Sequence, residues 1–312
     1  MANELELLVG PLLVLICFAL ILFGVFTFQV YFYWFTYEDD IRALRILVLV
    51  LWILECLHTC FCIHLLYTYL VVDFHNPEGI LQVVWSAGVT VFLEVFIVSG
   101  AQGFYILRIW QLSGHNILAT APPAFALFCR IAFGFATGSL LYCYRTWPEF
   151  REHTGSLFTL NCGLTLAAFV DLLTTAILSY YLRRNMHGFE RTRHVLQKLI
   201  FYTVNTGALT MVFSIAILFT FNFVTKSLMF AGMVEVVSKL YANSMLAMVN
   251  ARRHLKAQVY SGTVNSIALQ SPHASRPGAP DRVQVSVYRE VLADAGSTRS
   301  GDVSAKVDYA LA

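Results

Sequence analysis

Seven stretches of this 312-residue chain are long and apolar enough to cross a lipid bilayer as helices. About 20 apolar residues span the roughly 30 Å hydrocarbon core, since each helical residue rises about 1.5 Å. The stretches are too long for membrane strands and lack their alternation, and only helices and closed barrels satisfy their backbone inside lipid. The sequence therefore predicts an all-α membrane protein, a seven-transmembrane helix bundle. The predicted spans are residues 7–35, 46–70, 83–110, 117–142, 156–182, 199–223 and 230–250.

The composition excludes several other classes of protein. Hydrophobic residues make up 58% of the chain and charged residues 13%, whereas soluble domains are about 45–50% apolar and about 25% charged. This argues against an ordinary soluble enzyme, a disordered chain and a small disulfide-rich domain. The net charge of +2 gives no indication of a nucleic-acid partner, and none is expected.

Basic residues near the spans predict the orientation of the chain. Eleven Lys and Arg fall on one side of the predicted spans and three on the other, and the basic side of a membrane protein is normally cytoplasmic. The amino terminus is then outside and the carboxyl terminus inside, which requires an odd number of spans. We expect an integral, multi-pass protein, with the plasma membrane favoured over internal membranes. The eleven are Arg42, Arg45, Arg108, Arg183, Arg184, Arg191, Arg193, Lys198, Arg252, Arg253 and Lys256; the three are Arg145, Arg151 and Lys226.

The sequence divides into a membrane domain and a tail. Residues 1–256 form the predicted seven-helix domain, and residues 257–312, rich in Ser with Pro272, Pro277 and Pro280, form a predicted disordered cytoplasmic tail. The longest inner connection carries five basic residues that could contact a cytosolic partner or anionic lipid headgroups. Its plainer interpretation is the ordinary positive-inside signal. The five are Arg183, Arg184, Arg191, Arg193 and Lys198.

Six ionisable residues lie inside the predicted spans, which is the most informative feature for function. A charge at a helix centre costs about 2.5–3.5 kcal/mol on insertion scales, so these groups must face the bundle interior, pair or protonate. Four are carboxylates and two are cations, so at least two carboxylates lack a full-charge partner. We expect a polar intramembrane cavity here, although buried polar groups can also simply hold helices together. Its candidate residues are Glu55, His58, Glu94, Arg130, Asp171, Glu235, Lys239 and Asn243.

The cysteines and histidines do not predict a metal site. Glu55, His58 and Cys62 share one face of a single helix, whereas zinc sites usually recruit ligands from more than one element. A packed, hydrogen-bonded His58 is therefore favoured over a metal ligand, and no cofactor is expected. Cys143 and Cys162 should both lie near the outer face, where they are either a disulfide or two buried apolar side chains.

Four motifs resemble a large family of uncharacterised membrane proteins of basidiomycete, mushroom-forming fungi, a domain-of-unknown-function family. The chain departs from that family's usual residues at Glu55, where Asp is common, and at Arg193, where an acid or amide is common. The resemblance implies a seven-span bundle over nearly all of residues 10–256, and it implies no activity. The motifs are LECLHTCFCIHLLYTYL (Leu54–Leu70), QGFYILRIWQLSG (Gln102–Gly114), HGFERTRHVLQKLIFYTVNTGALT (His187–Thr210) and KLYANSMLAMVNARR (Lys239–Arg253).

Three functions fit this layout to different degrees. Seven spans with an outside amino terminus and a basic inner face favour a receptor or sensor for a small-molecule ligand. The charged midplane favours a secondary transporter or channel for a small solute or protons, although no internal repeat is evident. An intramembrane hydrolase is the remote alternative, because the chain lacks H-E-x-x-H, G-x-S-x-G and paired catalytic Asp motifs. We therefore expect no enzyme activity.

Overall fold

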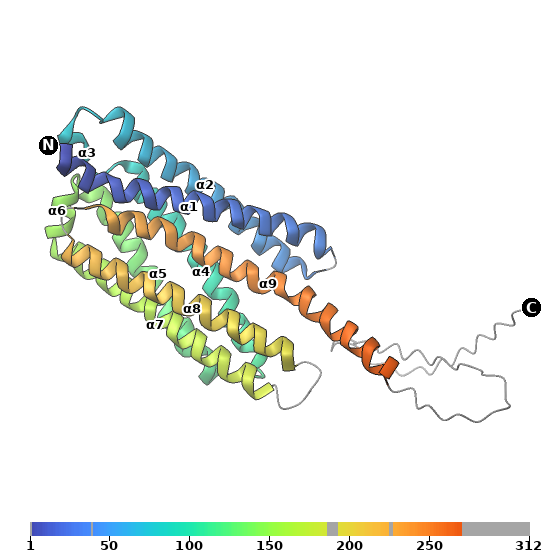
Figure 1. Ribbon diagram of the computed structural model, residues 1–312. Coiled ribbons are helices and arrows are strands. Elements are labelled where there is room, and N and C mark those ends of the chain that lie inside the picture. The colour runs from blue at the N-terminus through green and yellow to red at the C-terminus, as the bar shows by residue number, and fades with distance from the viewer. Residues whose placement is uncertain (1, 39, 186–192, 225–226, 270–312) are drawn as a thin grey trace, which may run out of the picture. The chain divides into compact units, whose positions relative to one another are not determined.

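The computed structural model describes the chain except for residues 1, 39, 186–192, 225–226 and 270–312. The described residues form helices and connecting turns, with one isolated β-bridge between Gln82 and Thr146. Long helices lie side by side and alternate in direction along the chain (Figure 1). The helices are α1 (Ala2–Thr36), α2 (Arg42–Tyr67) with its π-helical continuation η1 (Thr68–Val72), α3 (Pro77–Ile80), α4 (Trp85–Leu112), α5 (Ile117–Cys143), α6 (Trp147–Glu152), α7 (Thr154–Asn185), α8 (Arg193–Phe223) and α9 (Met229–Leu269).

Six of these helices are long and apolar enough to cross a membrane, which indicates an integral membrane protein. Their outward faces carry large apolar side chains such as Phe28, Phe125 and Phe219, as a lipid-facing surface requires. These spans match the first six predicted ones within several residues. They are Leu8–Thr36, Arg42–Val72, Trp85–Leu112, Ile117–Cys143, Thr154–Arg184 and Thr203–Phe223.

Helix α9 contains the seventh predicted span, residues 230–250, but it is not among these six. No residue from Met229 to Ala251 is exposed, whereas every other long helix has an exposed apolar face. Figure 1 shows α9 lying between α1 and α8. A helix surrounded by protein can carry polar side chains where a lipid-facing helix cannot. Helix α9 also continues through residue 257, where the tail is predicted to begin, and ends at Leu269.

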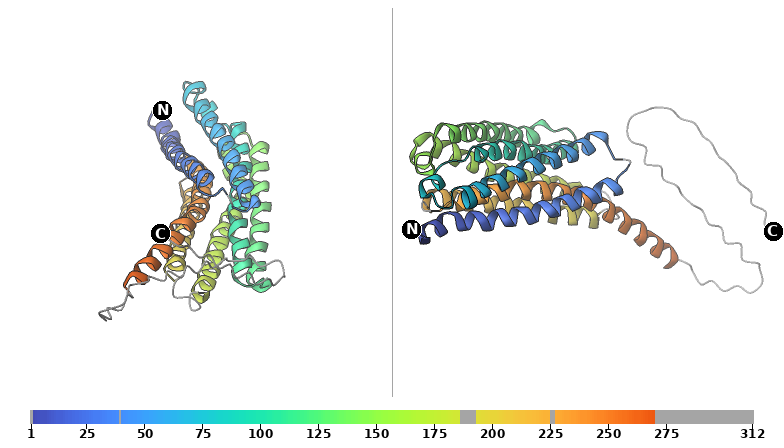
Figure 2. Two further views of the ribbon diagram at one scale, coloured as in Figure 1. Left: turned by 90° about the vertical axis from the view of Figure 1, so that its right-hand side faces the viewer. Right: turned by 90° about the horizontal axis from the view of Figure 1, so that it is seen from above.

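Glycines allow two of the closest helix contacts in the bundle. A Cβ added to Gly134 of α5 would lie 2.5 Å from a methyl group of Val95 in α4. A Cβ added to Gly232 of α9 would lie 2.8 Å from Cβ of Leu15 and 3.3 Å from Cα of Leu12 in α1. Small residues let membrane helices approach one another closely. Two further views show α4 beside α5, and α1 beside α9 (Figure 2).

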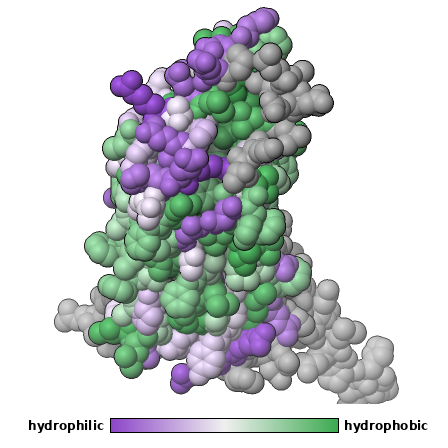
Figure 3. All heavy atoms as spheres, turned by 90° about the vertical axis from the view of Figure 1, so that its left-hand side faces the viewer, coloured by the Kyte–Doolittle hydropathy of each residue, from purple (hydrophilic) through white to green (hydrophobic). Residues whose placement is uncertain are grey.

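One end of the bundle, hereafter the α6 end, carries the amino-terminal end of α1 together with α3 and α6 (Figure 1). The Thr146 side chain accepts from the backbone N–H of Glu149 and so caps the start of α6, and the sequence Thr-Trp-Pro-Glu is a typical helix start. This short helix buries Trp147 and Phe150 against the bundle. Seen from this side, hydrophilic and hydrophobic side chains are mixed over the surface (Figure 3).

Candidate functional site

The ionisable residues of the spans meet around α9. Lys239 donates to the Glu55 carboxylate of α2 and to Nδ1 of His58, which lies 2.9 Å from its Nζ. All three side chains are buried, with Lys239 only 1% exposed. Because an ammonium can only donate, Nδ1 of His58 accepts, and the proton of this neutral ring lies on Nε2. Glu55 and Lys239, which are 184 positions apart in sequence, thus form a buried ion pair.

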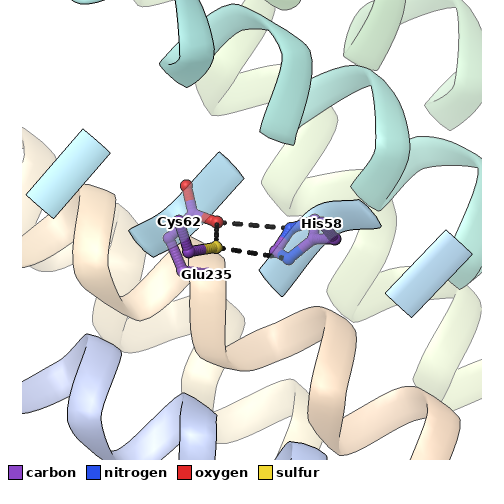
Figure 4. Close-up of side chains that lie close together, drawn as sticks. All are labelled: His58, Cys62 and Glu235. Atoms are coloured by element: carbon purple, nitrogen blue, oxygen red, sulfur yellow. Dashed lines mark hydrogen bonds and ion pairs between the residues drawn. The ribbon is translucent and has the colours of Figure 1, made fainter. Parts of the chain in front are cut away.

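Glu235, one turn before Lys239 on α9, collects several neutral donors. The Cys62 thiol donates to Oε2 at 2.9 Å and the Thr90 hydroxyl donates to Oε1 at 2.8 Å. His58 Nε2 lies 3.2 Å from the same Oε2. Figure 4 shows the side chains of His58, Cys62 and Glu235 converging from α2 and α9. Glu235 is therefore hydrogen-bonded, but it has no ammonium or guanidinium on its carboxylate among the described residues.

The three side chains in Figure 4 are of the types that bind zinc, and their ligand atoms lie within 4.8 Å of one another. The candidate ligands thus come from two helices, α2 and α9, whereas the sequence pattern placed them on one helix. The surroundings, however, do not suit a metal. A metal-bound His normally donates its other ring N–H to an acceptor, whereas Nδ1 of His58 faces the ammonium of Lys239. The arrangement fits a packed, hydrogen-bonded histidine better than a metal ligand.

A second polar cluster joins α4, α7 and α9. Asp171 accepts from the Tyr241 hydroxyl at 2.5 Å and from the Gln102 amide at 3.0 Å. Gln102 in turn accepts from Arg130 of α5 at 3.5 Å, and Arg130 pairs with Glu94 at 3.4 Å. Arg130 also lies over the Tyr241 ring, 5.8 Å from its centroid. The midplane groups of four helices are thus connected by side-chain contacts.

The structure shows which carboxylates have a cation partner. Glu55 pairs with Lys239, and Glu94 pairs with Arg130. Glu235 and Asp171 have neutral donors in their place, and no Lys or Arg of the described residues pairs with either. The count of four carboxylates against two cations thus resolves into two ion pairs and two carboxylates held by hydrogen bonds alone.

A cavity of about 100 Å³ lies between α4, α5, α7 and α9, next to this cluster. Its polar wall includes Glu94, Arg130 and Glu235, and the side chains of Glu94 and Arg130 keep 14% and 12% of their surface accessible. Its other walls are mainly apolar and aromatic. A single water needs about 10–15 Å³ of such volume, so there is room for several waters or a small ligand. We call this the larger cavity.

Helix α6 forms part of the wall of the larger cavity. Trp147 and Phe150 of this helix line the cavity. Arg151 fastens α6 by donating to the carbonyl oxygens of Val224 and Ser227, both at 3.0 Å. Burial lowers the pKa of Arg151 to about 10, so its guanidinium stays charged at neutral pH.

A smaller cavity of about 20 Å³ lies in the other half of the bundle, between α4, α7, α8 and α9. Asp171 and Tyr241 form part of its wall, together with hydroxyl groups of Thr174, Thr206 and Thr210. Each of the two carboxylates without a cation partner therefore lines one cavity. Gln102 connects them, because it contacts Arg130 of the larger cavity and Asp171 of the smaller one.

Of the eight candidate residues, four line neither of these two cavities: Glu55, His58, Lys239 and Asn243. Asn243 donates to the Leu22 carbonyl and accepts from Gln29, so it links α9 to α1. Conversely, Gln29 and Tyr241 are absent from the predicted set. Tyr241 looks like an ordinary aromatic in sequence, and its only signal is that it lies two residues after Lys239.

The remaining predictions concern the ends of the bundle. Arg183 and Arg184 are exposed in the last turn of α7. Arg193 begins α8 and Lys198 lies in its second turn, while Arg191 lies outside the described residues. Any partner of this basic group stays a prediction. Cys143 and Cys162 are both free thiols, as are the other five cysteines.

One comparison with known proteins found a match. The family of unknown function DUF6534 matches residues 167–254, which run from α7 into α9. The match includes Asp171, Glu235, Lys239 and Tyr241, and it covers two of the four motifs on which the sequence resemblance rests. No curated protein and no solved structure matches the chain. This region of the chain therefore resembles a family whose function is not known.

Proposed function

We propose that this chain is a seven-span receptor or sensor, with its amino terminus outside the cell and its carboxyl terminus in the cytoplasm. Helix α9 is the seventh span in this proposal, and the larger cavity binds a small ligand. The observation that carries the proposal is that the wall of the larger cavity includes Glu235, which belongs to the central helix. The plasma membrane is the proposed location, because an outside-facing ligand site serves a sensor there.

Contacts of α9 provide a route from the cavity to the rest of the bundle. Asn243 bonds to α1, Lys239 to α2, Glu235 to α4 and Tyr241 to α7. A ligand that binds one arrangement of these contacts better than another shifts the population towards that arrangement. Helix shifts of about 1–2 Å are a common element of such switches. The basic inner ends of α7 and α8 are the proposed output surface for a cytosolic partner.

A transporter for protons or a small solute is the second candidate. The observation that favours it is the presence of a cavity on each side of Gln102, each lined by a carboxylate without a cation partner. Transporters alternately expose a site near the bilayer midplane to the two sides, and here the Gln102 region between the two cavities would be that site. A transporter predicts that protons or a solute cross the membrane, whereas a sensor predicts that they do not.

A covalent probe of the larger cavity separates the two candidates. The variant Ala231→Cys places a thiol on the cavity wall, because Ala231 is partly exposed there, and methyl methanethiosulfonate can fill part of the cavity by modifying it. Peptide mass spectrometry checks modification at residue 231, and hydrogen exchange reports on residues 178–185 of α7 and 193–210 of α8. The sensor predicts altered exchange at these inner ends of α7 and α8, together with no proton uptake by vesicles that contain the protein.

Modification without any change in hydrogen exchange would contradict the sensor. Proton uptake that disappears in Asp171→Asn would favour the transporter. Ser238→Cys is the matched control, because Ser238 is fully buried on α9 and does not line the cavity. It should resist the reagent.

A further inference from the structure

The charges on the wall of the larger cavity are unequal. The wall carries the carboxylates of Glu94 and Glu235 against the single guanidinium of Arg130. Arg130 pairs with Glu94, and the neighbouring cation Lys239 is bonded to Glu55. The wall therefore has one more carboxyl group than it has cations, and low surrounding polarity strengthens the attraction of an ionised carboxylate for a cation.

A second observation concerns hydrogen bonding. Glu94 uses only one oxygen for Arg130, which leaves its second oxygen available to accept. The wall therefore offers a free carboxylate oxygen of Glu94 beside the guanidinium of Arg130.

The rest of the cavity sets the size and character of a ligand. Leu65, Val91, Ile131, Trp147, Phe150 and Phe230 form apolar and aromatic walls. A cavity of about 150 Å³ holds benzene in another protein. The larger cavity has a volume of about 100 Å³, so it suits a narrower group than benzene, such as a short alkyl chain.

We infer that the larger cavity binds a small primary ammonium with a short apolar tail. The ammonium donates to the free oxygen of Glu94, and its charge balances the carboxylate that exceeds the number of cations on the wall. The tail lies against the apolar walls under α6. A carboxylate ligand would add a third anion to a wall that has one guanidinium, and an alcohol would leave the charge unbalanced. This inference rests on the proposed function and names the ligand class of the same site.

The test compares three probes of nearly equal size that differ in the head group. Binding of n-butylamine, 1-butanol and sodium butyrate to the full chain in nanodiscs is measured by ligand-observed NMR at pH 7. Alkylamines are protonated at this pH, like the Lys side chain with its ordinary pKa near 10.4. We expect butylamine to bind at least about tenfold more tightly than butanol, as a charge-assisted hydrogen bond provides. Butyrate should bind least.

Two isosteric variants identify the groups that hold the ammonium. Glu94→Gln and Glu235→Gln should each weaken butylamine binding about tenfold or more and leave butanol binding little changed. Glu149→Gln is the matched control, because Glu149 is exposed on α6 outside the cavity. It should bind all three probes as the parent chain does.

The outcomes distinguish this inference from the proposed function. Butanol or butyrate binding as tightly as butylamine would overturn the ammonium class and leave a ligand cavity in place. No binding of any probe would overturn both. The comparison of probes uses the unaltered chain, so it stands even if a variant does not fold.

Discussion

Lys239 of α9 and Glu55 of α2 form a buried ion pair in which Lys239 also donates to His58. The pair joins the central helix to an outer helix at the level of the polar layer. Separating two buried charges leaves each in a surrounding of low polarity, which costs several kcal/mol. The pair should therefore largely determine the position of α9 relative to α2.

Replacing one member of this pair should be more damaging than replacing both. Lys239→Met leaves Glu55 buried without its cation, and we expect a loss of about 3–5 kcal/mol in unfolding free energy. The double variant Glu55→Met with Lys239→Met removes both charges and should recover much of that loss. Thermal unfolding in detergent measures both. A double variant no more stable than Lys239→Met would show that the charges are not coupled.

The Tyr241 hydroxyl should matter because Asp171 has no cation partner. Tyr241→Phe removes the donor at 2.5 Å and leaves a buried carboxylate with one fewer hydrogen bond. We expect a loss of about 1–3 kcal/mol in unfolding free energy. Tyr180→Phe is the control, because Tyr180 is 60% exposed on the same helix as Asp171. Equal effects of the two substitutions on thermal unfolding would contradict this prediction.

The close contact between α1 and α9 should depend on Gly232. In Gly232→Val the added atoms meet Leu15 and the backbone of Leu12, so the helices must separate. Overpacking of this kind costs about 1–3 kcal/mol. Gly24→Val in α1 serves as the control, because a Cβ there meets no atom within 4 Å. Thermal unfolding should separate the two variants, and a harmless Gly232→Val would show that this contact is not tight.

Arg151 should hold α6 over the larger cavity. Arg151→Met removes two hydrogen bonds to carbonyl oxygens, those of Val224 and Ser227, while keeping much of the side-chain length. We expect faster hydrogen exchange of residues 147–152, because their local opening costs less free energy without these bonds. Glu152→Gln is a control on the same helix. Unchanged exchange in Arg151→Met would mean that the aromatic contacts of Trp147 and Phe150 are enough to hold α6 in place.

The reactivity of the cysteines should follow their surroundings. Cys143 is exposed at the end of α5, whereas Cys62 is buried and donates to Glu235. A thiol must be accessible and able to ionise before it reacts. N-ethylmaleimide should therefore modify Cys143 in the folded protein and Cys62 only after unfolding, as peptide mass spectrometry can show. Modification of Cys62 in the folded protein would contradict its burial.

The sequence by itself determined the helical class and the first six apolar helices, because lipid-facing helices must be long and apolar whatever they contact. It also required the charges of Glu94, Arg130 and Asp171 to face inward, since exposure to lipid is too costly. The same reasoning showed that two carboxylates must lack a cation. It did not show that these are Glu235 and Asp171.

Only the tertiary structure decided the pairing, the central place of α9 and the two cavities. Pairing depends on which helices are neighbours and how each is rotated, and such contacts join residues far apart in sequence, as Gln102 and Asp171 do. The apolar pattern predicts a helix at residues 230–250, but it does not show that protein surrounds this helix. Cavities arise where side chains of several helices fail to fill the space between them. They therefore cannot be predicted from the sequence of any one helix.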